Sequence, residues 1–397
     1  PKKYRKKDVI LINKNTNLVE WALAHLKQPA QHLKQFDGLS NLTIIMPTFK
    51  RHDYVIRLIV YLSAFKVNLI IVDGSPEAID HRISSALASV PRFRYHHRAT
   101  SMPERIQFAN QFVKTEFVML MADDDFYLPT GLLSAMTMLA DSSTAVACMG
   151  QSIGLDVESS GAAYFFPYGE SLQNYSVQHD TPIERVRIGI RNYRSAASYA
   201  VFKANGFASI WKDIESSLCP EHLEYEHAMR TYLEGGLLTV NETYWVRSFE
   251  CDPVASVIDG NRANDFTTWY TSAVFAEEKN KFKVRLKNAF TQRLRISDMQ
   301  ADKLFLEICG YIISGSHTGL AGKPSPFIRT LLQAKLKLSD TFLAEVWAYL
   351  RLTIIALKLR NYLKVRERKV LDKERLCKTA EGCEYLSVLT CVEVYKS

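Results

Sequence analysis

A short apolar run at residues 117–121, FVMLM, is followed after Ala122 by three consecutive aspartates. An apolar run of this length with polar flanks predicts a buried strand. In α/β sheets ligands collect at the carboxyl ends of strands, so we expect Asp123, Asp124 and Asp125 at such an edge. Carboxylate oxygens there suit Mg²⁺ or Mn²⁺, which commonly hold a diphosphate. The alternative is a solvated acidic turn that caps the next helix, with Pro129 in its first turn.

Apolar runs and helical spacings alternate around this segment. We expect strands at residues 42–46, 67–72, 93–97, 117–121, 145–149 and 197–203. We expect helices at residues 53–65, 103–112, 130–139 and 221–233. The order strand, helix, strand predicts an α/β fold with a mixed, mainly parallel sheet flanked by helices, of the Rossmann-like nucleotide-binding kind.

The 397 residues are too many for one average domain. We expect a basic N-terminal extension at residues 1–40, with helical spacing over residues 17–36. The α/β domain should cover residues 41–258, and a mainly α-helical C-terminal domain residues 259–397. The sequence begins at Pro1 without a methionine, which leaves a longer parent protein open.

Net charge and cysteine usage limit the classes of partner and compartment. A net charge of +8 and a pI near 9.0 are compatible with phosphorylated ligands, anionic membranes or nucleic acid. We do not expect nucleic acid, because basic and aromatic residues do not interleave along a stripe. The seven cysteines are odd in number and isolated, which indicates reduced thiols in a cytoplasmic protein.

No signal peptide and no uncharged apolar run of about 18 residues is present, so we expect no membrane span. The basic and apolar stretch at residues 342–370 has three interpretations. It could contact a membrane peripherally, pack in a core, or join copies of the chain in a homo-oligomer.

Four segments, in this order, resemble the GT-A glycosyltransferases, especially the family 2 group of bacterial surface-polysaccharide synthesis. They are TIIMPTFKR at 43–51, IIVDGSPE at 70–77, FVMLMADDDFYLP at 117–129 and YAVFKANGF at 199–207. The resemblance covers about half of the chain and lies in the motif order more than in any single match. It implies a GT-A-like fold for the α/β domain.

The resemblance also implies roles at the ends of these strands. The loop after the first strand would lie over the nucleotide base, and Asp73 would contact that base. Asp123 would hold the ribose and could share the metal, Asp125 would bind the metal, and Asp124 could do either. The residues implied to bind the donor are Pro47, Thr48, Phe49, Arg51, Asp73, Arg98, Arg105, Asp123, Asp124 and Arg247. Arg247 stands where many relatives have a metal-binding histidine, so it would contact the diphosphate directly.

A fifth segment, LEYEHAMRTYLEG at 223–235, bears on the mechanism. Inverting relatives open a helix with a Glu-Asp pair, and Glu224 stands at the position of that Asp, although Leu223 replaces the Glu. A general base at a helix start can face an acceptor hydroxyl. Glu226 is the second candidate, because Glu226, Arg230 and Glu234 also have the spacing of a salt-bridge ladder. Glu221 is the third.

The resemblance therefore implies a glycosyltransferase acting in cell-surface polysaccharide synthesis. It would transfer a sugar, with inversion and with Mn²⁺ or Mg²⁺, from a nucleotide-sugar donor to a hydroxyl of a glycan or lipid-linked acceptor. The donor is expected to be a UDP-sugar. One alternative is a sugar-phosphate nucleotidyltransferase, against which the absence of glycine from PTFKRHDY counts. The other is a non-catalytic module that binds nucleotide-sugars.

Overall fold

The computed structural model describes residues 18–26, 34–158, 161–165, 175–248 and 265–314, together with 172, 369–370, 384 and 388. The basic cluster expected near the N-terminus lies outside the described residues. So does nearly all of the stretch at 342–370.

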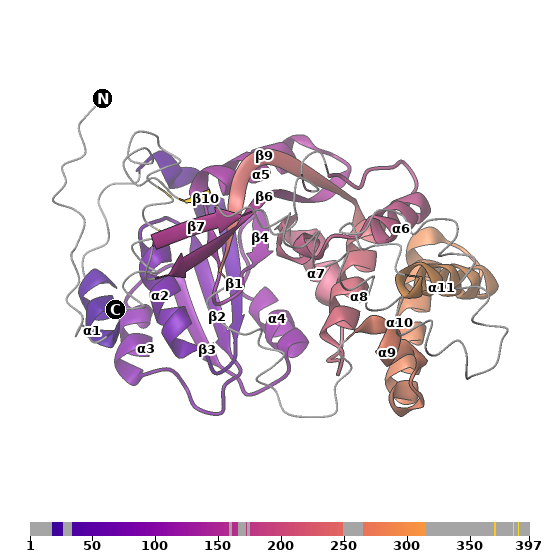
Figure 1. Cartoon of the computed structure of the whole chain (residues 1–397), viewed down its shortest axis with the longest axis horizontal. Coiled ribbons are helices and arrows are strands. Elements are labelled where there is room, and N and C mark those ends of the chain that lie inside the picture. The colour runs from indigo at the N-terminus through magenta and orange to yellow at the C-terminus, as the bar shows by residue number, and fades with distance from the viewer. Residues whose placement is uncertain are drawn as a thin grey trace.

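A mixed sheet runs through the first part of the molecule (Figure 1). Its parallel half contains β3 (Phe93–His97), β2 (Asn68–Asp73), β1 (Leu42–Thr48) and β4 (Phe117–Leu120), side by side in that order. β1 and β2 are buried almost throughout, as expected when helices cover both faces of a parallel sheet. The α/β fold with a mixed sheet flanked by helices is confirmed, but among the described strands four pairings are parallel and five are antiparallel.

The sheet continues beyond β4 with β8 (Val201–Lys203), β6 (Ala145–Glu158), β7 (Gly161–Phe165) and β10 (Lys369–Val370), each antiparallel to its neighbour. A long strand, β9 (Gly236–Ser248), runs parallel to β6 and also pairs with the short β5 (Phe126–Tyr127). Through this second pairing, the end of β9 lies next to the chain that follows the three aspartates.

Helices α2 (His52–Ser63), α3 (His81–Ala88), α4 (Met102–Asn110) and α5 (Pro129–Asp141) connect the strands of this sheet. α5 packs closely on β9 at Gly131. A Cβ added at this glycine would lie 2.4 Å from the Thr243 carbonyl oxygen. Larger side chains there would push the helix away from the strand. The N-terminal α1 (Leu18–Leu26) packs on α2 and α3.

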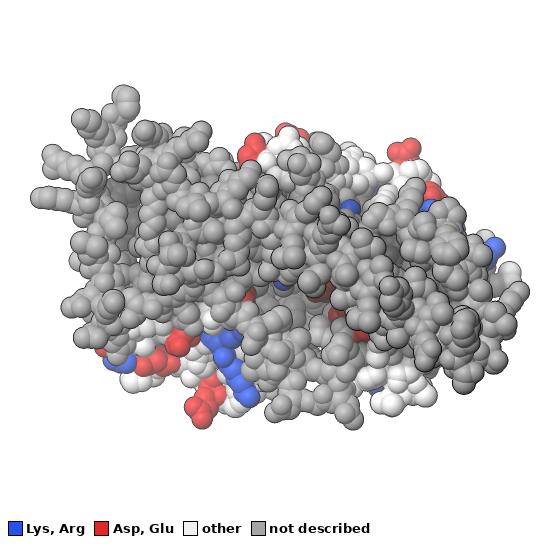
Figure 2. Space-filling view, in the orientation of Figure 1, with Lys and Arg blue, Asp and Glu red and all other residues white. Residues whose placement is uncertain are grey.

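The remaining helices gather on the other side of the molecule (Figure 1). α8 (Pro220–Glu234) is buried along most of its length between α6 (Pro182–Arg191), α7 (Ala204–Trp211) and α10 (Ala276–Leu294). α11 (Asp298–Ile313) packs on α10 and α6, and the short α9 (Phe266–Thr271) packs on α11. The described part of the C-terminal region is thus helical. On the face seen in Figure 2, the charged residues that the structure describes are scattered and do not gather into a patch of one sign.

One expected strand is shorter than its pattern predicted. Of the strand expected at 197–203, only Val201–Lys203 is extended, and Ser195–Tyr199 forms a 3₁₀ helix. Within the stretch with helical spacing at 17–36, α1 spans Leu18–Leu26 and Lys34–Asn41 forms a 3₁₀ helix, while residues 27–33 lie outside the described residues. A short apolar run fits a strand or a helical turn equally well, so periodicity alone could not separate them.

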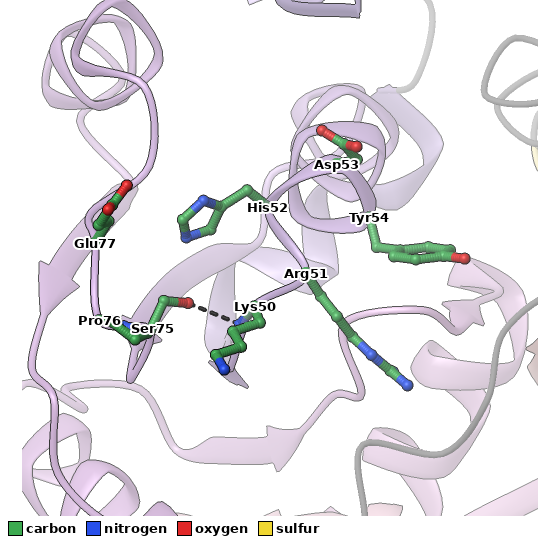
Figure 3. Close-up of a pocket in the computed structure, with 8 residues that line it drawn as sticks. All are labelled: Lys50, Arg51, His52, Asp53, Tyr54, Ser75, Pro76 and Glu77. Atoms are coloured by element: carbon green, nitrogen blue, oxygen red, sulfur yellow. Dashed lines mark hydrogen bonds between the residues drawn. The ribbon is translucent and has the colours of Figure 1, made fainter. Parts of the chain in front are cut away.

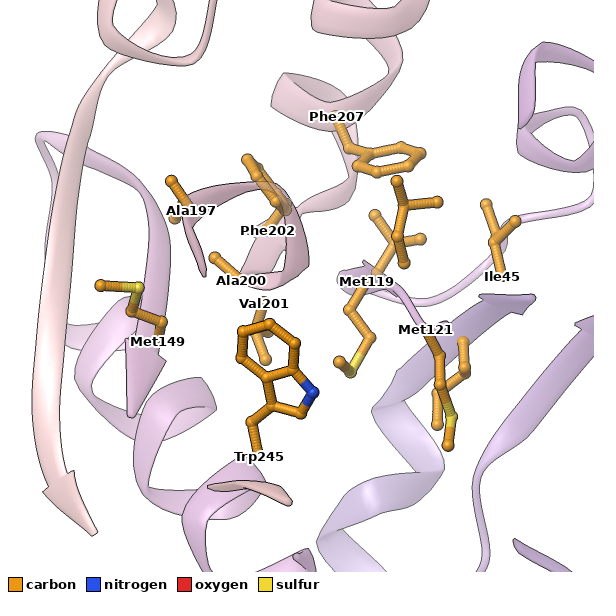
Figure 4. Close-up of a cluster of buried hydrophobic side chains, with 14 of the residues drawn as sticks. Ile45, Met119, Met121, Met149, Ala197, Ala200, Val201, Phe202, Phe207 and Trp245 are labelled. Carbon is orange, nitrogen blue, oxygen red and sulfur yellow. The ribbon is translucent and has the colours of Figure 1, made fainter. Parts of the chain in front are cut away.

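A hydrophobic cluster lies where β4, β8 and β9 meet. Met119, Phe202, Phe207 and Trp245 are fully or almost fully buried there (Figure 4). The described cysteines, Cys148, Cys219 and Cys309, are buried free thiols. None of the described helices is long and apolar enough to cross a membrane.

Candidate active site

The carboxyl ends of β1, β2 and β4 bring the expected donor-binding residues together. The Thr48 hydroxyl donates to Asp123 at 2.7 Å, and Thr48 stands opposite Asp73 in the register of β1 and β2. Arg51 Nη1 donates to Asp123 at 3.1 Å and to Asp124 at 2.9 Å. The acids therefore face the loop after β1. They do not cap α5, whose N-cap is Leu128.

Asp125 is buried, like Asp123, and lies beside the end of β9. Its side chain accepts from the Trp245 indole and the Ser248 amide, both at 2.8 Å, so the end of β9 holds it. Burial, reinforced by the neighbouring Asp124 charge, raises the pKa of Asp125 to about 8. Burial and Asp124 also raise the pKa of Asp123 to about 6, against hydrogen bonds from Thr48 and Arg51. Such a cluster of desolvated carboxylates would be stabilised by a cation.

The carboxylates fit a divalent ion only if other ligands complete its shell. Among the described residues, no group of three or more His, Cys, Asp or Glu side chains is placed to hold a metal by itself. Mg²⁺ sites commonly use one or two carboxylates, with substrate phosphates and water as the other ligands. Asp125 and Asp123 match that kind of site, since each oxygen of Asp125 keeps a second lone pair beside its hydrogen bond.

The two arginines expected near the diphosphate lie in different environments. Arg105 is buried beneath the ends of β1 and β2, where it donates to the carbonyls of Thr48 and Val72. Desolvation lowers its pKa, against the charges of Asp73 and Asp123. A side chain at Gly74 would collide with the Arg105 guanidinium. Arg98 is exposed, with its guanidinium 4.1 Å from the centre of the Phe108 ring.

A pocket of about 590 Å³ opens between the loop after β1 and the loop after β2. Lys50, at its rim, has a left-handed backbone with φ 55°, and its amide donates to the Ser75 hydroxyl at 2.8 Å. The bond ties the two loops together (Figure 3). The lining residues are Lys50, Arg51, His52, Asp53, Tyr54, Ser75, Pro76 and Glu77. Pro47 and Phe49 are part-exposed in the same segment.

Glu224 lies in the second turn of α8, surrounded by protein but still partly exposed. The Tyr193 hydroxyl donates to its Oε2 at 3.3 Å. Burial raises the pKa of Glu224 to about 7, with a further contribution from Glu221, while Tyr193 and Arg247 act in the opposite direction. A carboxylate with this pKa can accept a proton near neutral pH.

Tyr199 lies beside the end of β9 that holds Asp125. Burial raises its pKa, and the charges of Glu224, Asp125 and Asp124 raise it further, while Arg247 opposes them. The Tyr199 ring also packs against Trp245, with ring centres 5.1 Å apart. The Tyr199 ring therefore lies beside the indole that donates to Asp125, and the charges of Glu224 and Arg247 are close enough to act on its pKa. In the sequence Tyr199 opens the fourth motif, YAVFKANGF, but nothing there distinguished it from the other apolar residues of that run.

Glu226 has a different environment from Glu224. Its fully buried carboxylate pairs with Arg285 at 2.8 Å and Arg230 at 3.0 Å, and His222 lies 3.5 Å away. Burial alone would raise its pKa, but His222, Arg285 and Arg230 lower it to about 2. This carboxylate is a poor proton acceptor at neutral pH, and it joins α8 to α10.

The salt-bridge ladder expected on α8 forms only in part, and the third candidate base, Glu221, accepts a backbone hydrogen bond. Glu226 pairs with Arg230 as the spacing predicted, but Glu234 pairs with Arg293. Glu221 accepts from the Phe266 amide at 2.6 Å, which ties the first turn of α8 to α9.

A fully buried arginine, Arg57, supports the aspartate loop from α2. Its Nη2 donates to the Asp124 carbonyl at 2.9 Å, and its guanidinium lies 4.8 Å from the centre of the Phe126 ring. The sequence did not mark Arg57 as a functional residue, because it is a single charged residue within an apolar helical segment.

Similarity to known proteins is found among solved structures, at low sequence identity and with TM-scores below 0.5. No protein-family model matches the chain, and no curated protein does. Among solved structures the chain is similar to S. aureus TarS 1–349 in complex with UDP-GlcNAc, at 13% identity and a TM-score of 0.48, over 89% of each chain. TarS 1–349 without this ligand matches at 12% identity and a TM-score of 0.45, again over 89% of each chain. A longer TarS structure matches at 14% identity and a TM-score of 0.42, over 68% of this chain and 43% of that one.

Proposed function

We propose that this protein is a glycosyltransferase that moves a sugar from a nucleoside diphosphate donor, a UDP-sugar, to an acceptor hydroxyl. The observation that carries the proposal is that Glu224, Arg247 and the acids at the end of β4 all act on the pKa of Tyr199, whose ring packs on the Trp245 that donates to Asp125. These groups combine a proton acceptor with a pKa near 7, a cation and carboxylates suited to a metal, as transfer from a diphosphate requires. The order of the four sequence motifs supports the same activity.

In this proposal the donor lies along the ends of β1, β2 and β4. The pocket beside Arg51 takes the nucleoside, and Asp123, held by Thr48 and Arg51, contacts the ribose. Asp125, with Asp123, holds Mn²⁺ or Mg²⁺, which would neutralise charge on the departing diphosphate. Arg247, part-exposed beside Trp245, contacts the same phosphates.

Glu224 acts as the general base. It removes the proton from the acceptor hydroxyl as that oxygen bonds to the anomeric carbon and the bond to the diphosphate breaks. One base and one displacement invert the configuration at that carbon. Tyr193, which donates to Oε2, keeps the carboxylate oriented. We place Glu226 in the structure of α8 and not in the chemistry, because its partners hold its proton affinity low.

The acceptor class rests on the motif resemblance. We propose a glycan or lipid-linked acceptor in cell-surface polysaccharide synthesis, with the protein in the cytoplasm or peripheral at the inner face of the membrane. The transferred sugar would then be a hexose or a related sugar.

The test is to incubate the protein with UDP-, GDP-, CMP- and TDP-sugars, UDP-GlcNAc among them, with and without Mn²⁺. We expect release of UDP that depends on Mn²⁺ and rises when an acceptor glycan is added. Release of pyrophosphate from a nucleoside triphosphate and a sugar phosphate, without sugar transfer, would instead establish a nucleotidyltransferase. Binding of a nucleotide-sugar without turnover on any acceptor in a glycan panel would favour a non-catalytic module.

A further inference from the structure

Asp73 is too enclosed to contact a ligand in the pocket. Its side chain is 0% exposed, so no ligand in the pocket can reach it. Oδ1 accepts from the Ser75 amide at 2.9 Å. Oδ2 accepts from the Tyr95 hydroxyl and lies against His52 Nε2, both at 2.7 Å. The residue implied to contact the base therefore contacts another side chain.

His52 is the exposed end of this pair. It is the first residue of α2, its side chain is 27% exposed, and it lines the pocket. The ring projects into the space between Glu77 and Lys50 (Figure 3). Among the described residues, no partner is recorded for its Nδ1.

The contact with Asp73 fixes which nitrogen of His52 carries the hydrogen. Burial would raise the pKa of Asp73, but hydrogen bonds from Ser75 and Tyr95 lower it on balance, so the group is a carboxylate. A carboxylate only accepts hydrogen bonds, so Nε2 must be the donor. In the neutral imidazole Nδ1 then carries a lone pair, and it presents an acceptor to the pocket.

We propose that His52, oriented by Asp73, selects the donor nucleotide by accepting a hydrogen bond from a protonated ring nitrogen of its base. Uracil, thymine and guanine carry such a ring N–H, whereas cytosine and adenine present a lone pair at the corresponding nitrogen. Two acceptors facing each other in a partly buried pocket are unfavourable, so those bases are rejected.

The pocket is coupled to the phosphate end through the same loop. Arg51, next to His52, lines the pocket and also donates to Asp123 and Asp124. A base held by His52 would thus place its phosphates toward the aspartates. The inference rests on the proposed use of a nucleoside diphosphate donor. It specifies that the base of this donor carries a ring N–H.

The experiment compares the affinities of UDP, N3-methyl-UDP, CDP and GDP by isothermal titration calorimetry at pH 8, with Mn²⁺ present. We expect UDP to bind the native protein about tenfold or more tightly than N3-methyl-UDP and CDP, the effect of one lost hydrogen bond that leaves a polar group unpaired. His52→Phe should bring these ratios to within about twofold of unity. His52→Gln should restore them, because its amide can donate to Asp73 and accept from the base.

Uracil and guanine both carry a ring N–H, and the affinity for GDP relative to UDP shows which of the two bases the pocket prefers. Either UDP or GDP bound more tightly than CDP supports the inference, and the stronger of the two identifies the base. His81→Phe, an exposed histidine at the start of α3, is the matched control and should leave all ratios unchanged. Thermal unfolding of each variant verifies that the fold is retained.

Three outcomes overturn the inference. The first is that His52→Phe keeps the full preference for UDP while Asp73→Ala loses it, which would return base contact to Asp73. The second is that the native protein binds all four ligands equally or prefers CDP, in which case the inference fails and the proposed transferase function stands. The third is that no nucleoside diphosphate binds, which defeats the proposed function as well.

Discussion

Glu224 and Glu226 are two residues apart on α8, and exchanging each for glutamine should have opposite consequences. Glu224→Gln removes the proton acceptor but keeps an oxygen that can accept from Tyr193. Loss of a general base lowers turnover by about 10²- to 10⁴-fold. We therefore expect kcat to fall at least about a hundredfold, with the affinity for UDP within about threefold of native.

The stability of Glu224→Gln should not fall. The pKa of Glu224 is raised to about 7 from a usual 4.5, so the folded native protein binds more protons than the unfolded chain between these values. The free energy of unfolding of the native protein therefore decreases as the pH rises through this window. Glutamine has no such charge, so Tm at pH 8 should equal or exceed the native value.

Glu226→Gln should instead destabilise the protein. The pKa of Glu226 is lowered to about 2, so its ion pairs stabilise the fold above pH 4.5 and are lost as the pH falls through about 2. A shift from 4.5 to about 2 corresponds to about 3 kcal/mol at neutral pH, which would lower Tm by several degrees. Residual transfer should remain in the folded fraction.

Thermal unfolding and UDP release measured on both variants decide between the two residues. The reasoning would be refuted if Glu224→Gln retained transfer within about threefold of native. It would also be refuted if Glu226→Gln were inactive but as stable as the native protein, since Glu226 would then be the base.

Three further predictions concern the same site. The value of log kcat/KM should rise with pH and level off above about 7, because Glu224 acts deprotonated; a flat profile from pH 5.5 to 8.5 would contradict this role. Removing divalent ions with EDTA should lower transfer by about a hundredfold or more, and adding Mn²⁺ or Mg²⁺ should restore it. Full activity in EDTA would show that arginine side chains neutralise the diphosphate without a metal ion. Tyr199→Phe should lower kcat about tenfold without changing Tm, because the charges of Glu224 and Asp125 both act on this hydroxyl; an unchanged kcat would show that Tyr199 takes no part in the reaction.

The sequence predicted the part of the site that depends on strand order. Apolar runs before Pro47, Asp73 and Asp123 indicated strands, and parallel strands end at one edge of a sheet, so their polar residues meet. The spacing around Glu224 likewise predicted a residue in the first turns of a helix.

What the sequence could not predict depends on contacts between distant segments. The bond of Tyr193 to Glu224 joins residues 31 positions apart, and that of Trp245 to Asp125 joins residues 120 apart. Neither pattern nor propensity records such pairs. His52 adjoins the motif that marked the nucleotide loop, yet its contact with Asp73 appears only when β1 and β2 lie side by side.

The hairpin of β6 and β7 and helices α3, α6 and α7 were also not expected. β7 and α6 fall in or beside the stretch at 151–199, where the hydrophobic periodicity is weak. The position of these elements is determined by their packing against distant parts of the chain. A Cβ at Gly189 of α6, for example, would lie 2.3 Å from the Tyr232 ring of α8, so the two helices meet closely through a glycine that carries no periodic signal.

A crystal structure with a UDP-sugar and Mn²⁺ tests the central claim most directly, because it measures where the diphosphate and the anomeric carbon lie. The account predicts Mn²⁺ within ligation distance of Asp125 and the diphosphate. It also predicts the base beside His52 and the anomeric carbon facing Glu224, with room for one acceptor hydroxyl between them. A nucleotide bound away from the ends of β1, β2 and β4, or a sugar whose anomeric carbon faces Glu226, would contradict it.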